Sequence, residues 1–299
     1  MGQKTHFIAY AELTLSMIFL GSTFVMGKNL ITVFPIFLLL GVRFLIGTVC
    51  FSVAYCFNKV KIKEFENTLT KKDWFLLFLQ SLFGAFLFNF FILLGLKFTS
   101  ANAAAILTST IPAFITVFSY LILREYISRY KSIAIALSIA GLILVTVDPA
   151  HFVSNSINLW GNLLIFLAVI SGSLFPICIK LLSNKVPTLF ISFTFNLFGL
   201  LLFLPISISD AVHFNFRLIS MFTWLLVIFY GVTANVLYLN FWNKGLSVVP
   251  ASTASLFVAV MPISTGILAY IFLNEMLTVL QIGGIVCVTA AIIFGVYKT

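Results

Sequence analysis

The sequence predicts an all-α membrane protein whose ten transmembrane helices form two inverted five-helix repeats. Three observations support this fold class: an apolar composition, ten apolar runs of membrane-spanning length, and a self-match at an offset of 150 residues. Of the 299 residues, 62% are hydrophobic and 8% are charged. A soluble domain has roughly 45–50% apolar and about 25% charged residues. We therefore expect the lipid bilayer to be the partner of most of the surface.

The apolar runs fall into two groups of five. A helix that crosses the hydrocarbon core needs about 20 predominantly apolar residues. The first group lies at 7–27, 33–57, 74–96, 101–123 and 131–147. The second group follows a polar stretch and lies at 159–180, 187–207, 221–243, 251–273 and 279–297. We expect one five-helix unit at residues 1–150 and another at residues 151–299.

The distribution of basic residues predicts the orientation in the membrane. With a cytoplasmic N-terminus, 13 of the 17 Lys and Arg residues fall on the inside. Only Lys28, Lys97 and Arg217 then fall outside, and Arg43 lies within a span. Because short cytoplasmic loops are enriched in Lys and Arg, both termini are predicted to be cytoplasmic. The short termini favour a bacterial inner (plasma) membrane.

The self-match joins the segment that begins at Gly95 to the segment that begins at Gly245, without gaps. Identities at the same offset include Gly95/Gly245, Ala101/Ala251, Pro112/Pro262, Tyr120/Tyr270 and Glu125/Glu275. Matches in Gly, Pro, Tyr and Glu are much harder to obtain by chance than matches in Leu and Ile. Because each half holds an odd number of spans, the second half should be inverted. Inverted repeats around a midplane site are typical of alternating-access transporters.

Several other function classes are not supported by the sequence. There is no Walker A motif, no G-x-S-x-G elbow and no H-E-x-x-H pair, so we expect no enzymatic activity. The four Cys residues form no C-x-x-C pair and the three His residues are scattered, which predicts neither a metal nor a cofactor. The Lys and Arg residues form no continuous basic patch, so nucleic acid is not an expected partner.

The repeated Gly-Leu, Pro and Glu positions, the GSTF sequence at Gly21 and the Arg43-Phe44 pair resemble the drug/metabolite transporter superfamily. Within it, the chain is similar to EamA-type ten-helix transporters over nearly its whole length. This resemblance implies two helical bundles around a central cavity and a fold shared with bacterial exporters of amino acids and metabolites.

Two charged residues inside predicted spans are candidates for transport chemistry. Arg43 lies near the middle of the second span, where a charge is costly and therefore a functional hypothesis. It could anchor a substrate carboxylate or phosphate, or form a gating ion pair. Alternatively, it could cap carbonyls at a helix end or pair with Glu12. Glu12 is the candidate for proton coupling, although an interfacial charge that reaches water is the favoured interpretation.

Polar residues on helix faces complete the candidate binding site. Asn235, Tyr238 and Trp242 lie on one face of the eighth span, which suits either a solute cavity or hydrogen bonding between helices. Asn89 in the third span is a weaker candidate. The fourth span adds Asn102 and Ser109 on a stripe of small residues.

Two prolines at equivalent positions are candidate hinges. Pro112 and Pro262 each remove a backbone donor near the midplane of a span, which permits a kink. Simple packing kinks are the alternative. The fifth and tenth spans carry stripes of small residues, and we expect these two helices to pack on each other.

We therefore expect a secondary transporter for an amino acid or a related carboxylate-bearing solute, working by alternating access with export as the favoured direction. The alternatives are a facilitative carrier for another amphipathic metabolite or drug, and a non-transporting receptor or assembly protein. Expected partners are the small-molecule substrate, the lipid bilayer and, as a candidate coupling ion, the proton. A monomer or a weak homodimer is expected.

Overall fold

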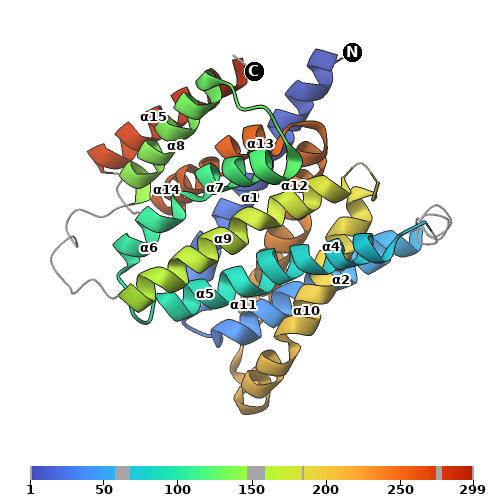
Figure 1. Ribbon diagram of the computed structural model, residues 1–299. Helices are drawn as coiled ribbons and strands as arrows, with labels where there is room; N and C mark the ends of the chain where they lie inside the picture. The colour runs from blue at the N-terminus through green and yellow to red at the C-terminus, as the bar shows by residue number, and fades with distance from the viewer. Residues whose placement is uncertain (1, 58–67, 147–158, 184, 274–277, 298–299) are drawn as a thin grey trace.

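The computed structural model describes residues 2–57, 68–146, 159–183, 185–273 and 278–297 (Figure 1). Within these ranges, ten helical segments are long and apolar enough to cross a membrane. Each coincides with one of the ten predicted spans, so the prediction of an all-helical, multi-pass membrane protein is confirmed.

The first five spans are built from both continuous and interrupted helices. Spans 1, 2 and 5 are the single helices α1 (Gly2–Leu30), α2 (Ile36–Phe57) and α8 (Arg129–Thr146). Span 3 consists of α4 (Lys71–Ser81), a π-helical segment (Leu82–Leu87) and α5 (Phe88–Gly95). Span 4 consists of α6 (Ala101–Thr108), α7 (Ile111–Phe118) and a π-helical segment (Ser119–Leu123).

The second five spans follow a similar plan. Spans 6, 7 and 10 are α9 (Leu159–Leu182), α10 (Thr188–His213) and α15 (Val279–Tyr297). A short 3-10 helix (Phe216–Leu218) follows α10. Span 8 consists of α11 (Met221–Gly231), a π-helical segment (Val232–Leu237) and α12 (Tyr238–Val248). Span 9 consists of α13 (Ala251–Phe257) and α14 (Val260–Leu273).

Helix capping fixes the start of span 3 three residues before its predicted start. The Thr70 hydroxyl accepts a hydrogen bond from the Asp73 backbone N–H at 3.3 Å, and the Asp73 carboxylate accepts one from the Thr70 N–H at 3.0 Å. This capping box stabilises a first turn that contains Lys71 and Lys72 and therefore does not look apolar. At an offset of 150 residues, Ser220 caps span 8 through the Thr223 N–H at 3.1 Å.

The same offset relates the irregular parts of the long spans. The π-helical segments Leu82–Leu87 and Val232–Leu237 start 150 residues apart. Span 4 is interrupted at Ser109–Thr110, and span 9 is interrupted at Val258–Ala259, within one residue of the equivalent position. The departures from regular helix therefore occur at corresponding places in the two halves.

Helix packing also pairs elements across the two halves. The most extensive contacts are between α8 and α15, between α2 and α10, and between α1 and α12, followed by α1 with α14 and α5 with α9. Figure 1 shows α8 and α15 side by side, and both chain termini at the same end of the molecule. Spans from both halves thus enclose the middle of the protein.

Small residues allow α8 and α15 to pack closely, as their sequence predicts. A Cβ on Gly141 would lie 2.7 Å from the Val288 side chain and 3.0 Å from the Gly284 carbonyl oxygen. A Cβ on Gly284 would in turn lie 2.6 Å from the Val145 side chain. The two small-residue faces therefore cover each other within one chain.

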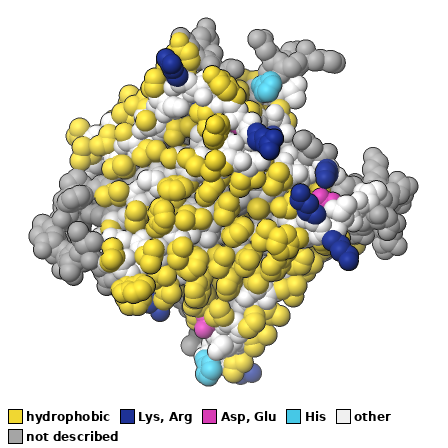
Figure 2. All heavy atoms as spheres, in the orientation of Figure 1, with side chains coloured by type: hydrophobic (Ala, Val, Ile, Leu, Met, Phe, Trp, Pro, Cys, Tyr) yellow, Lys and Arg dark blue, Asp and Glu magenta, His cyan; other side chains and the backbone are white. Residues whose placement is uncertain are grey.

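The polarity of the molecule is arranged for a lipid solvent. Figure 2 shows hydrophobic side chains over most of one face, with charged side chains near its edges. Exposed apolar side chains include Phe7, Val212 and Phe222, each at least 74% exposed. Gln80, Asn196 and Asn243 are polar and at most 1% exposed. This distribution is the one expected where the surroundings are apolar and buried polar groups bond to each other.

Candidate functional site

A cavity of about 580 Å³ lies between the helices of the two halves. Spans 1, 2, 3, 4, 6, 7, 8 and 9 all contribute residues to its wall. Most of the lining side chains are apolar or aromatic, as in typical small-molecule sites. The polar and amphipathic lining side chains are Thr23, Lys28, Arg43, Asn89, Tyr230, Asn235, Tyr238 and Trp242.

Arg43 projects from α2 into this cavity. Its guanidinium carbon lies 5.1 Å from the centre of the Phe44 ring and 6.0 Å from the centre of the Tyr230 ring. Its Nε is buried without a hydrogen-bond partner among the described residues. The alternative pairing with Glu12 is not formed among the described residues, and the charged group that acts on Glu12 is Lys244. Arg43 therefore lines the cavity as a cation without an ion-pair partner among the described residues.

Trp242 and Tyr238 form an aromatic wall on α12. Their ring centres are 6.3 Å apart, and the ring planes are stacked at 28°. Trp242 is only 2% exposed, and its indole Nε1 has no hydrogen-bond partner among the described residues. A buried indole N–H usually finds a partner. The indole N–H is thus a buried donor without an acceptor in a residue whose ring lines the cavity.

Asn235 lines the cavity and also joins two helices. Its Nδ2 donates to the Asn196 Oδ1 at 2.6 Å, and the Asn196 Nδ2 donates to the Ser192 carbonyl at 2.8 Å. A side chain on Gly47 of α2 would collide with the Asn196 amide. Both interpretations of Asn235, cavity wall and interhelical hydrogen bonding, therefore describe its position.

The remaining polar candidates differ in where they lie. Asn89 lines the cavity, and its Nδ2 donates to the Ala85 carbonyl at 2.6 Å. Ser109 is buried at 3% exposure, but it lies outside the cavity lining and donates to the Ala105 carbonyl at 2.7 Å. The side chain of Asn102 falls outside the described residues. Glu12 is partly buried and also lies outside the cavity lining.

Two π-helical segments bring backbone and side chains to the cavity wall. Gly84 belongs to the first segment, and Ala234 and Asn235 belong to the second. A π-helical turn widens a helix locally, and such turns are frequent at functional sites. Sequence reasoning misses these turns, because apolar periodicity does not reveal them.

Both candidate hinge prolines follow an interrupted helix. Pro112 lies in the first turn of α7, directly after the break at Ser109–Thr110. Pro262 lies in the first turn of α14, after the break at Val258–Ala259. Proline is well tolerated in a first helical turn, where its missing N–H would have no partner.

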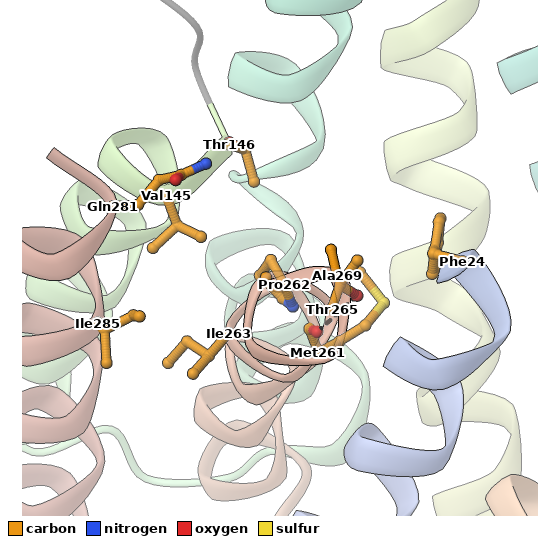
Figure 3. Close-up of a pocket in the computed structure, with 11 residues that line it drawn as sticks. Phe24, Val145, Thr146, Met261, Pro262, Ile263, Thr265, Ala269, Gln281 and Ile285 are labelled. Atoms are coloured by element: carbon orange, nitrogen blue, oxygen red, sulfur yellow. Dashed lines mark hydrogen bonds between the residues drawn. The ribbon is translucent and has the colours of Figure 1, made fainter. Parts of the chain in front are cut away.

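A second cavity of about 330 Å³ lies beside Pro262, between α1, α8, α14 and α15. Figure 3 shows Pro262 and Thr265 on α14, with Gln281 and Val145 on the neighbouring helices. Phe24 and Met261 line both cavities and so stand between them. This side cavity holds no Lys, Arg, Asp or Glu among its described lining residues, so the larger cavity is the better candidate site.

A polar cluster closes the end of the protein where span 8 meets span 9. The Glu125 carboxylate accepts hydrogen bonds from the Ala251 N–H at 2.8 Å and from the Ser252 N–H and hydroxyl at 3.1 and 2.7 Å. The Lys131 ammonium donates to the Ser252 hydroxyl at 3.2 Å. Because Arg124 adopts a left-handed backbone conformation (φ 57°), the chain turns sharply just before Glu125.

Lys180 stabilises the same end of the protein through the C-terminal end of α12. Its ammonium donates to the carbonyl oxygens of Leu246, Ser247 and Val249, at 2.9, 3.2 and 2.8 Å. These carbonyls end α12, where a cation is favoured by the helix dipole. The repetition of Glu125 at Glu275 indicates a structural role for the glutamate from sequence alone. For the basic residues of the cluster, Lys131 and Lys180, the sequence indicates only the orientation of the chain in the membrane.

Three comparisons with known proteins agree with this architecture. The EamA-like transporter family matches residues 8–147 and again residues 159–297. The uncharacterized transporter YetK of Bacillus subtilis (strain 168) is 36% identical over 292 residues, covering 97% of this chain and 87% of that protein. An uncharacterized transporter of Archaeoglobus fulgidus is 24% identical over 289 residues, covering 95% of this chain and 96% of that protein.

A solved crystal structure supports the fold alone. It is 15% identical in sequence, has a TM-score of 0.80, and covers 100% of this chain and 98% of that chain. The similarity extends over the whole helical assembly, including the regions that enclose the central cavity.

Proposed function

Because the chain belongs to the EamA-like transporter family, we propose that it is a secondary carrier for a small carboxylate-bearing metabolite, such as an amino acid or a related solute. The observation that carries this proposal is the central cavity, whose wall includes the Arg43 guanidinium with no ion-pair partner among the described residues. A carboxylate can pair with this guanidinium, and a hydrogen bond to a charged group contributes about 1.5–3 kcal/mol.

The difference between the two ends of the protein supports alternating access. All seven residues of α13 are at most 3% exposed. Of the six side chains described in α6, only Ala104 is buried. The cavity lining extends to Lys28, in the last turn of α1, and to Ile31, just after it. The end with α13 is therefore closed and the end with α6 is looser.

We propose that transport alternates between this state, with the α13 end closed and the α6 end loose, and a state in which the two ends are reversed. The breaks at Ser109–Thr110 and Val258–Ala259 let α6 and α13 change angle without breaking regular helix. Pro112 would prevent α6 and α7 from forming one continuous helix, and Pro262 would do the same for α13 and α14. In the opposite state, α13 would loosen and α6 would close over the cavity. Two five-helix units of opposite orientation, at residues 1–150 and 151–299, give this exchange its symmetry.

The cellular setting completes the proposal. We place both termini in the cytoplasm of a bacterial cell, with the chain in the inner membrane, because 13 of the 17 basic residues then face inward. The closed end carries the Glu125 cluster and would face the cytoplasm. Because the small-residue faces of α8 and α15 cover each other, we propose that the carrier works as a monomer.

Uptake into liposomes that contain the purified protein tests the carrier function. The labelled panel holds amino acids, nucleosides and organic anions. We expect saturable uptake of carboxylate-bearing solutes and a large loss of that uptake in Arg43→Ala. Full transport by a correctly folded Arg43→Ala variant would rule out Arg43 as the anchor, and uptake confined to nucleosides would rule out the carboxylate class.

The same liposomes test coupling to protons. No described residue of the cavity wall is Asp or Glu, and Glu12 lies outside the lining. We therefore expect the initial rate of uptake to be the same with and without an imposed pH gradient, as in facilitated transport. A rate that rises with the gradient and loses that rise in Glu12→Gln would assign coupling to Glu12 instead.

A further inference from the structure

We propose that the central cavity selects organic monoanions, with one carboxylate on an apolar or aromatic body, over zwitterionic amino acids that have the same body. This inference rests on the proposed function and narrows its substrate class. It follows from the charges of the wall, from the kinds of hydrogen-bonding group that lack partners, and from the apolar character of the remaining surface.

The charge on the wall has one sign. Lys28 and Arg43 both line the cavity, whereas none of its described lining residues is Asp or Glu. The described carboxylates have other partners or positions: Asp73 caps α4 and Glu125 caps α13. A bound carboxylate would therefore neutralise Arg43 and would meet no repelling group on the wall.

A zwitterion leaves a different charge balance. Its carboxylate can neutralise Arg43, but its ammonium group then restores a net positive charge next to the guanidinium. An uncompensated charge in an apolar site is costly, because desolvation is not repaid by a partner of opposite sign. The same molecule without its ammonium group leaves its pair with Arg43 neutral.

The groups on the wall that lack partners are donors. The Arg43 Nε and the Trp242 Nε1 are buried without acceptors among the described residues. An ammonium group brings three more donors and accepts nothing. The wall offers it neutral amide oxygens and hydroxyls, which supply hydrogen bonds but no compensating charge. The described wall therefore carries positive charge at Arg43 without a negative partner, and a negatively charged acceptor suits it better than another donor.

The rest of the wall suits an apolar body. Leu40, Phe88, Phe175 and Phe195 line the cavity around Arg43 and Trp242. Aromatic and aliphatic surfaces gain free energy when they exclude water from a similar ligand surface. The preferred ligand is thus amphipathic, with its anionic group at Arg43 and its body against these rings.

Isothermal titration calorimetry on the purified full-length protein in lipid nanodiscs tests the selection. The probes are 3-phenylpropionate, phenylalanine and phenethylamine, which share a phenyl body and differ in their charged groups. A second set, 4-methylpentanoate, leucine and 3-methylbutylamine, varies the body. In the better-binding set, we expect the monoanion to bind at least about ten-fold more tightly than the amino acid. The amine should show no binding.

Two variants identify the group responsible. Arg43→Gln should weaken binding of the monoanion about ten- to hundred-fold, the equivalent of a lost hydrogen bond to a charged group, and should erase the preference over the amino acid. Arg217→Gln removes the same charge from an exposed position outside the cavity lining and should bind like the unmodified protein. Size-exclusion and thermal-unfolding profiles verify that both variants are folded.

The outcomes separate this inference from the proposed function. If the amino acid binds as tightly as the matched monoanion, and both depend on Arg43, selection against zwitterions is wrong while the carboxylate carrier stands. If no probe binds, or if binding is independent of Arg43, the proposed function and this inference are both overturned.

Discussion

At the scale of single residues, the contact between Asn196 and Asn235 shows how the cavity wall is held. Their amides bond at 2.6 Å across α10 and the π-helical part of span 8, and Gly47 of α2 packs directly over them. Such hydrogen bonds within a membrane are worth about 0.6 kcal/mol on average. The wall therefore depends on close packing around the pair as much as on the bond itself.

The close approach at Gly47 yields a stability prediction. In Gly47→Ala, the added methyl group would collide with the Asn196 amide and lie 2.9 Å from the Asn235 Cβ. We expect a loss of about 1–3 kcal/mol in the free energy of unfolding, as for overpacking elsewhere. Thermal or denaturant unfolding of the purified protein measures it.

Gly283→Ala is the matched control, because nothing lies within 4 Å of a Cβ on this glycine of α15. It should leave stability unchanged or raise it slightly, since Ala favours helix over Gly. Equal losses in the two variants would show that the contact at Gly47 is not limiting.

At the scale of elements, several side chains from other parts of the chain hold α13 at the closed end. Glu125 binds its first two backbone N–H groups, Lys131 binds the Ser252 hydroxyl, and Lys180 binds the carbonyls that end α12 just before it. The carboxylate satisfies donors that would otherwise have no partner at the helix start. Polar side chains from the loop after span 4, from span 5 and from span 6 therefore hold this end together.

We predict that Glu125→Gln loosens this end. A neutral amide makes weaker hydrogen bonds than a carboxylate and lacks the attraction to Lys131. In a background without the four native Cys residues, a Ser255→Cys probe, at a position with 0% exposure, should react faster with a maleimide when Glu125 is replaced.

Asp210→Asn, which makes the same chemical change at the far end of α10, is the control for this labelling experiment. It should leave the rate at position 255 unchanged. If the probe reacts equally fast with and without the Glu125→Gln substitution, the carboxylate does not hold α13.

At the scale of the whole molecule, the positions of charged residues predict the orientation in the membrane. Lys185 lies between α9 and α10 at the closed end, and its side chain is 66% exposed. Arg217 is exposed beyond the opposite end of α10. A chain that crosses the membrane through α10 must place these two residues on opposite sides.

Labelling of intact cells checks this prediction. In the background without native Cys, Arg217→Cys should react with a membrane-impermeant maleimide, whereas Lys185→Cys should react only after the cells are opened. The reverse pattern would place the termini outside and the Glu125 cluster at the outer face.

Much of the fold can be predicted because a bilayer imposes strong local constraints. Each span must satisfy its own backbone hydrogen bonds and present about 20 apolar residues, so composition along the chain reveals it. The start at Thr70 differs from its prediction by a few residues, because capping depends on polar side chains that hydropathy counts as loop. The stripes at Gly141 and Gly284 are informative because close helix contact requires small residues.

The candidate site can be predicted in part. Arg43, Asn89, Asn235, Tyr238 and Trp242 line one cavity, and each is a polar or amphipathic residue in an apolar run. Ser109 is equally polar but lies outside that lining and bonds to its own helix. The sequence pattern does not predict which face of a helix a residue occupies once the span is widened by a π turn or broken near a proline.

The sequence by itself determined the number of spans, their approximate limits and the residue types available for chemistry, because each of these follows from short stretches of chain in an apolar solvent. Only the tertiary structure decided which polar groups share the cavity, which described donors lack partners there, and that Glu125, Lys131 and Lys180 close one end. These features depend on helix rotation and on contacts between residues far apart in the chain, such as Lys180 with Leu246, which no local pattern records.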